Sequence, residues 1–284
     1  MDILMALVPT LMWGVLGLVG TLLGGSSYSK TLGTTFGALF FAITVYIFVQ
    51  PMLNQTILIV GFISGVFWTI GQQFQFKSME YIGVSLTVPI SAGMQLISTT
   101  IISVLVFNEW KTAIQVVLGT AAIFILIIGI VLMSIRDKRT ESKIPAQFKQ
   151  GIAVLVISTI GYVVYVIILR WFNIDGWSAI LPQSIGMVVG AVLLSINQKA
   201  YTKYAFRNVL TGIIFATGNL FMLLSIPRVG VSISYSFSQA GAIISTIGGI
   251  VLLGEKKTKK QMVAVVIGCI FIVTGGILID LTKG

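Results

Sequence analysis

Residues 71–85, GQQFQFKSMEYIGVS, recur 147 positions later as residues 218–232, GNLFMLLSIPRVGVS. Six of the fifteen positions are identical, and Gln72 in the first copy is matched by Asn219 in the second. Further matches are Gly14 with Gly161, Ser98–Thr99 with Ser245–Thr246, and, after a slip of two residues, 35–42 with 184–191. The chain therefore consists of two related halves.

Composition places both halves in a membrane. The chain has 284 residues, 56% of them hydrophobic and 9% charged, and a mean hydropathy of +1.03, whereas soluble domains carry about 25% charged residues. Apolar runs near the length of about 20 residues that crosses a bilayer recur ten times, and strand-type alternation is absent. The predicted fold is an all-α integral membrane protein with ten transmembrane helices, at about 3–23, 33–50, 57–77, 83–106, 113–134, 151–169, 177–195, 208–226, 231–253 and 262–280.

Each half holds five of these helices, residues 1–135 in the first and 151–284 in the second, with a charged linker at 136–150. Because five is odd, the second half enters the membrane from the opposite side, so the repeat is inverted. In transporters such repeats place the substrate site near the bilayer midplane, between the halves. A relic of duplication in a protein that transports nothing stays open at this point.

The net charge of +10 has a one-sided distribution. The loops after the first, third, fifth, seventh and ninth predicted helices hold fourteen of the Lys and Arg residues, and the remaining connections and termini hold four. By the positive-inside rule the fourteen face the cytoplasm. We therefore expect a multi-pass protein of the cell membrane with a cytoplasmic linker and both termini extracellular. Basic loops of this kind indicate topology and secondarily lipid contact, not nucleic-acid binding.

Several chemistries lack the residues that they need. The chain has no histidine and one cysteine, Cys269, so we expect no metal site, no disulfide and no cofactor. No nucleophile with an acid–base pair is recognisable, which disfavours an enzyme such as a lipid-modifying one. None of the eight carboxylates falls at the centre of a predicted helix: Asp2, Glu80, Glu109, Asp137, Glu141, Asp175, Glu255 and Asp280. A cation exporter needs such a charge, so a neutral polar solute is favoured.

Neutral amides interrupt the third predicted helix instead. Trp68, Gln72 and Gln75 share one helical face by their spacing. Amides offer donors and acceptors together, and aromatic rings cover apolar ring faces, a combination suited to a sugar. The alternative is that such side chains only join helices, at about 0.6 kcal/mol per hydrogen bond. The candidate substrate-binding residues are Trp13, Trp68, Gln72, Gln73, Gln95, Gln183, Asn219 and Gln239.

Three segments carry a family resemblance: 64–96 (SGVFWTIGQQFQFKSMEYIGVSLTVPISAGMQL), 33–42 (GTTFGALFFA) and 181–187 (LPQSIGM). Together with the ten-helix inverted repeat, they resemble the glucose/ribose uptake proteins of Gram-positive bacteria, in the drug/metabolite transporter superfamily. The likeness covers essentially the whole chain and is nearer the glucose members. It implies import of a sugar across the cytoplasmic membrane, often proton-linked, although the mid-membrane region lacks a carboxylate for that coupling.

The expected function is thus uptake of a small neutral monosaccharide, glucose before ribose, by alternating access. Alternatives are a ribose carrier, a relative in the same superfamily that exports amino acids or cationic drugs, and a structural or sensory membrane protein. The sequence leaves open the proton coupling, the direction of transport and the choice between monomer and homodimer.

Overall fold

The computed structural model describes residues 2–133, 146–229, 237–238 and 240–282, and this part of the chain contains helices and no strand. Nine of its helical segments are long and apolar enough to cross a membrane, which confirms the predicted all-helical membrane protein. In chain order the helices are α1 (Asp2–Leu23), α2 (Ser27–Val49), α3 (Gln55–Ile82), α4 (Val84–Phe107), α5 (Ala113–Met133), α6 (Ala146–Trp171), α7 (Gly176–Ser195), α8 (Lys203–Arg207), α9 (Val209–Val229), α11 (Gly241–Val251) and α12 (Lys259–Leu281).

The predicted span 231–253 is filled only in part by described residues. Residues 231–236 and Gln239 lie outside them, and α11 supplies 11 apolar residues, fewer than the about 20 that cross a bilayer. The inverted pair of five-helix halves therefore stays a prediction. The domain linker 136–150 also falls largely outside the described residues, although α6 already begins at Ala146.

Several helices begin earlier than their hydropathy suggests, because polar residues form their first turns. α2 starts at Ser27 rather than at 33, and the Ser26 side chain accepts a hydrogen bond from the Ser29 amide. Such caps satisfy one of the four N–H groups that a helix leaves free at its start. The early start brings Lys30 into α2, where only 5% of the residue is exposed.

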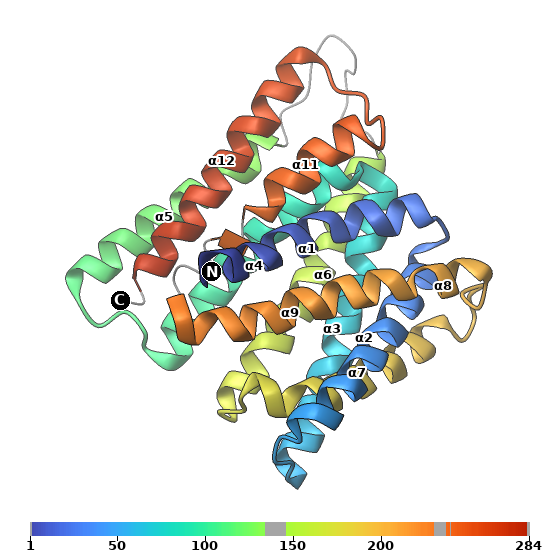
Figure 1. Cartoon of the computed structure of the whole chain (residues 1–284). Helices are drawn as coiled ribbons and strands as arrows, with labels where there is room; N and C mark the ends of the chain where they lie inside the picture. Colours follow the sequence, from blue (N-terminus) through green and yellow to red (C-terminus); the bar gives the residue numbers. More distant parts are fainter. Residues whose placement is uncertain (1, 134–145, 230–236, 239, 283–284) are drawn as a thin grey trace.

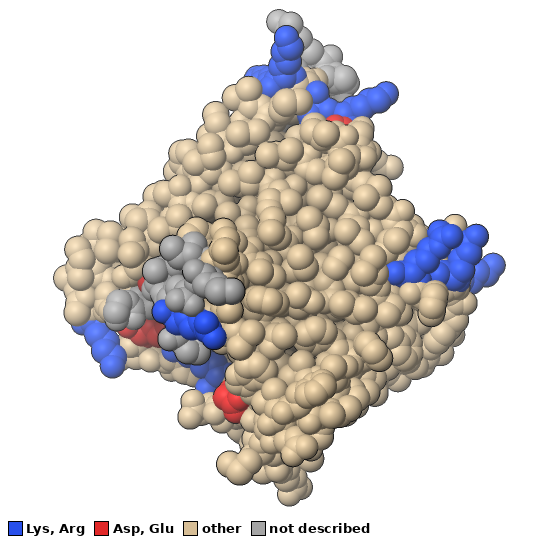
Figure 2. Space-filling view, in the orientation of Figure 1, with Lys and Arg blue, Asp and Glu red and all other residues tan. Residues whose placement is uncertain are grey.

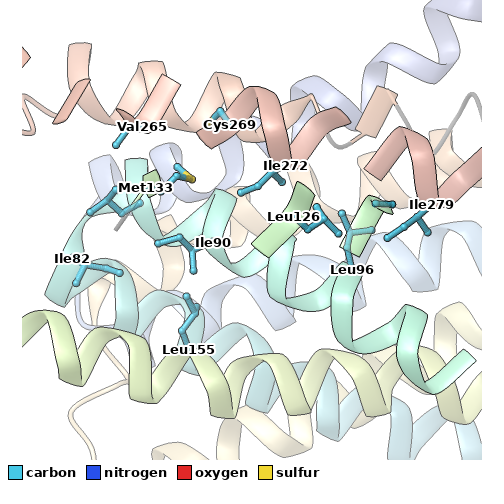
Figure 3. Close-up of a cluster of buried hydrophobic side chains, with 12 residues drawn as sticks. Ile82, Ile90, Leu96, Leu126, Met133, Leu155, Val265, Cys269, Ile272 and Ile279 are labelled. Atoms are coloured by element: carbon cyan, nitrogen blue, oxygen red, sulfur yellow. The ribbon is translucent and has the colours of Figure 1, made fainter. Parts of the chain in front are cut away.

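The two helices α5 and α12 run side by side along one edge of the molecule (Figure 1). Figure 3 shows the apolar cluster between this pair and its neighbours, in which Leu126 of α5 lies near Ile272 of α12, while Ile90 comes from α4. All three side chains are fully buried. Because lipid tails are as apolar as these residues, close packing rather than removal from water stabilises the contact.

The remaining long helices surround the centre of the molecule. α3 packs against α6 and α7, α1 packs against α9 and α11, and α2 contacts both α7 and α9. α4 closes the arrangement by contacts with α6 and α11. α1 begins and α12 ends on the same side of the molecule, and α8 lies on the other (Figure 1). These packing partners leave a space among α1, α3, α4, α6, α9 and the start of α11.

Charged side chains are absent from the broad middle of the face that Figure 2 shows. Figure 2 shows an uncharged face with Lys and Arg gathered at its margins, one group lying over α8. Large apolar side chains such as Phe48, Phe124 and Leu105 are 82%, 62% and 78% exposed. Exposed apolar surface on this scale suits contact with lipid.

Candidate functional site

A cavity of about 340 Å³ lies at the centre of the helices. Five of the eight candidate residues from the sequence line it: Trp13, Trp68, Gln72, Gln95 and Asn219. Among the described residues that line it there is no Asp, Glu, Lys or Arg. The cavity is thus polar through amides and hydroxyls and carries no formal charge from these residues.

One face of α3 lines the cavity. Trp68, Gln72, Gln75 and Met79 follow one another at spacings of four, three and four, which places them on the same side of a helix. Trp68 is 1% exposed and Gln72 is 2% exposed. The Trp68 ring contacts the ring of Phe215 from α9, with centroids 4.5 Å apart. This aromatic pair gives the cavity an apolar wall next to the amides.

A chain of hydrogen bonds runs across three helices beside that wall. The Tyr162 hydroxyl of α6 lies 2.9 Å from Gln72 Oε1 and 3.1 Å from Gln75 Oε1. Gln75 Nε2 donates to Ser91 Oγ on α4 at 2.9 Å, and Gln95 Nε2 donates to the same oxygen at 3.0 Å. A tyrosine hydroxyl has one hydrogen, so it serves one amide oxygen at a time. Gln75 Oε1 also accepts from Gln72 Nε2 at 3.5 Å. Because each amide oxygen has two lone pairs, both can still accept a further hydrogen bond from a bound solute.

Helices α1 and α9 supply further lining residues. Trp13 donates from Nε1 to the carbonyl oxygen of Phe215 at 3.4 Å, which ties α1 to α9. Asn219, one turn after Phe215, interacts with the side chain of Tyr165 from α6. Tyr165 lines the cavity as well. Asn219 therefore sits where the polar groups of α6 and α9 meet.

Two candidates point elsewhere, and a third cannot be placed. Gln73 donates from Nε2 to Ser27 Oγ at 3.1 Å, between α3 and α2. Gln183 donates to Ser64 Oγ at 2.9 Å, and it also interacts with Tyr165. Neither Gln73 nor Gln183 lines the cavity. Gln239 lies outside the described residues.

Several further residues line the cavity that are not among the candidates from the sequence, although the sequence carries signals for them. Phe215 is the repeat partner of Trp68 at the offset of 147 and precedes Asn219 by four residues, as Trp68 precedes Gln72. Tyr162 is a polar aromatic residue in a largely apolar stretch. The lining residues in question are Gln75, Tyr162, Tyr165, Phe215 and Ser238.

Comparison with known proteins gives the family. The family model described as sugar transport protein matches residues 4–282. The chain belongs to the sugar transport protein family. The glucose uptake protein GlcU of Bacillus subtilis (strain 168) is 51% identical over 284 residues, which cover 100% of this chain and 99% of that protein. A Bacillus cereus (strain ATCC 10987 / NRS 248) protein with the provisional name of sugar uptake protein is 54% identical over 283 residues, with 100% of both chains covered.

A solved structure shares the fold. One crystal structure superposes with a TM-score of 0.63 over 99% of this chain and 98% of its own, at 16% identity. At that identity the likeness concerns the fold alone. The relatives in sequence and the relative in structure each cover the chain from end to end, so the whole chain, and not one half of it, is the unit that is shared.

Proposed function

We propose that this protein is an uptake transporter for a small neutral monosaccharide, of the glucose type, in the cytoplasmic membrane. The observation that carries the proposal is the central cavity, whose described lining offers amides, hydroxyls and aromatic rings without a charged group. Sugars present hydroxyls at their edge and C–H groups on their faces, which match amides and aromatic rings. The names of the family members agree with this substrate class.

The size of the cavity fits one sugar unit. Its volume of about 340 Å³ lies at the lower end of the range of about 300–1,000 Å³ for small-molecule sites. We assign Gln72 and Gln95 to the sugar hydroxyls and Trp68 to the sugar face, and Asn219 contributes from the other half. The absence of an acid among the described lining residues argues against a carrier of cations, which would need a counter-charge at the site.

Alternating access by two inverted halves is part of the proposal, and exchanged contacts support it. A Cβ atom on Gly37 of α2 would collide with the carbonyl oxygen of Val209 in α9, and one on Gly186 of α7 with that of Phe62 in α3. The repeat pairs Gly37 with Gly186 and Phe62 with Val209. The two contacts therefore exchange with each other, as expected for an approximate two-fold axis between the halves.

Uptake by purified protein in proteoliposomes tests the function. We expect saturable uptake of glucose, competition by unlabelled glucose, and little effect of amino acids or organic cations. Faster uptake of ribose at equal concentration would favour the ribose alternative. The absence of saturable uptake of any sugar in a panel, by protein that elutes as a folded species, would contradict the proposal and leave a structural or sensory role.

A further inference from the structure

The joint between α3 and α4 is a single residue, Gly83, which has a φ of 82°. Glycine adopts this backbone conformation without steric cost, but it has no side chain with which to cap the next helix. No side chain at the cap position bonds the start of α4. The first N–H groups of α4 therefore need a partner from outside the helix.

Glu255 is that partner, and it comes from the other half of the chain. Its Oε1 accepts from the amide of Val84 at 2.6 Å and from that of Ser85 at 3.3 Å. The Ser85 hydroxyl also donates to the carboxylate. Negative charge at a helix N-terminus is stabilised by the helix dipole, and hydrogen bonds to a charged acceptor are about twice as strong as neutral ones.

The helix before Glu255 also touches α4 directly. A Cβ atom on Gly249 of α11 would lie 2.8 Å from the Ser85 amide nitrogen, so only glycine allows this approach. Thr246 Oγ1 lies 3.3 Å from the Ser85 carbonyl oxygen. Lys257 Nζ is 4.0 Å from Glu255 Oε2, and the Glu255 side chain is 15% exposed. Glu255 thus fastens two helices that contact each other at one end of the molecule.

This contact lies about one helical turn beyond residues that line the cavity, Met79 on α3 and Val88 on α4. Leu16 and Met79 line the cavity and belong to the same buried apolar cluster as Val84, against which Leu253 also packs. A Cβ atom on Gly17 would meet Met79 Cε at 2.9 Å, so α1 and α3 are in close contact at this level. Leu16 and Met79 therefore lie between the cavity and the bonds that Glu255 makes to the start of α4.

We propose that Glu255 holds the α3–α4 end of the cavity closed, and that loss of its bonds to the first turn of α4 opens this end. The inference rests on the proposed transport function, in which the cavity must open at each end in turn. By the charge distribution this end faces the cytoplasm. Glu109, the residue close to the repeat position of Glu255, pairs with Arg170 instead, so a different contact joins the helices at the other end.

The test follows access to the cavity from one side. The reporter is Ala92→Cys, a lining position on α4, in protein whose Cys269 is replaced by alanine. Everted membrane vesicles expose the cytoplasmic side to a membrane-impermeant maleimide. Glu255→Gln keeps the size of the side chain and removes its charge, so we expect labelling about tenfold faster than in the parent. Glu255→Asp, which keeps the charge, should show a smaller increase.

Two further variants separate opening from general loosening. Glu109→Gln is the matched control, since it neutralises the corresponding carboxylate at the other end; labelling in everted vesicles should not change. Ser85→Ala removes one of the bonds to Glu255 and should raise labelling about threefold. This second variant also serves if Glu255→Gln folds poorly.

The outcomes are distinct. Equal labelling of the parent, Glu255→Gln and Ser85→Ala in everted vesicles would overturn the inference, as would an equal rise in right-side-out vesicles. Labelling needs no sugar, whereas the proposed function is tested by uptake. Faster labelling without any sugar uptake by the parent would therefore reject the transport function and leave the role of Glu255 intact. Normal uptake with unchanged labelling would reject the role of Glu255 alone.

Discussion

At the scale of single residues, Gln72 has two roles to separate. It accepts a hydrogen bond from Tyr162 on another helix, as a residue that joins helices would, and it lines the cavity, as a residue that binds a solute would. Both roles involve the same buried amide. They predict different results for a variant that removes the amide and keeps the volume of the side chain.

We expect the Gln72→Leu variant to fold normally but to transport the sugar poorly. Gln72→Ala should weaken the apparent affinity for the sugar roughly two- to twelve-fold, because it loses one neutral hydrogen bond. Concentration-dependent uptake in proteoliposomes measures this. Gln73→Leu is the matched control, because Gln73 bonds Ser27 away from the cavity; it should lower the melting temperature and leave affinity unchanged. Normal affinity for the sugar in Gln72→Leu and Gln95→Leu would show that both amides only join helices.

Tyr162 gives an independent test of the same amides. Tyr162→Phe removes the hydroxyl shared by Gln72 and Gln75 and keeps the ring that packs edge-on to Trp68. We expect the apparent affinity to fall roughly two- to twelve-fold, with a smaller change in maximal rate. An unchanged affinity would show that the hydroxyl does not orient the amides for binding.

Which amides meet the cavity could be predicted only in part. Gln72 and Trp68 share a face by spacing alone, and Asn219 is found through the repeat. Gln73 is adjacent to Gln72 in sequence but about 100° further around the helix, and only the position of α2 shows that this direction leads to Ser27. Gln183 likewise depends on how α7 is turned toward Ser64. The direction in which a helix face points is a tertiary property.

At the scale of helices, glycines set how closely α2 approaches α9 and α3 approaches α7. Besides the contacts of Gly37 and Gly186, a Cβ atom on Gly65 would collide with the carbonyl oxygen of Gln183, and one on Gly212 with that of Thr34. These two contacts also exchange under the repeat. The sequence shows glycines four residues apart, as at Gly61 and Gly65, but it does not show which helix each one contacts.

We therefore expect Gly186→Ala and Gly37→Ala to destabilise the protein by similar amounts, about 1–3 kcal/mol each, because a methyl group must displace backbone. Thermal unfolding of the purified variants in detergent measures this. Ala121→Val enlarges an exposed position on α5 and should leave the melting temperature within experimental error. A large loss in only one of the two glycine variants would argue against equivalent halves.

At the scale of the whole molecule, orientation in the membrane rests on the fourteen-to-four distribution of basic residues. The termini of the described chain share one side, and α8 lies on the other (Figure 1). Asn197, in the exposed turn after α7, should then face the cytoplasm. In a variant without Cys269, the cysteine introduced by Asn197→Cys should not be labelled by an impermeant maleimide in intact cells. Met52→Cys, at a residue that is 88% exposed between α2 and α3, should react. Labelling at position 197 and none at position 52 would show that the protein has the opposite orientation in the membrane.

The coupling of transport to protons also depends on where charges lie in the whole molecule. No carboxylate is among the described residues that line the cavity. Glu80 bonds the start of α2, and Glu109 pairs with Arg170. Asp280 is buried near the end of α12. A proton carried with the sugar needs a titratable group that responds to the sugar, so we expect facilitated diffusion.

Glucose uptake into proteoliposomes should then continue, to equal concentrations on both sides, when an ionophore removes the pH gradient. An imposed gradient should produce no accumulation above the external concentration. Accumulation that requires the gradient, and that Glu80→Gln, Glu109→Gln or Asp280→Asn abolishes, would identify that carboxylate as the proton carrier. The protein would then couple the two solutes over a distance, through movement of the helices rather than through contact within the cavity.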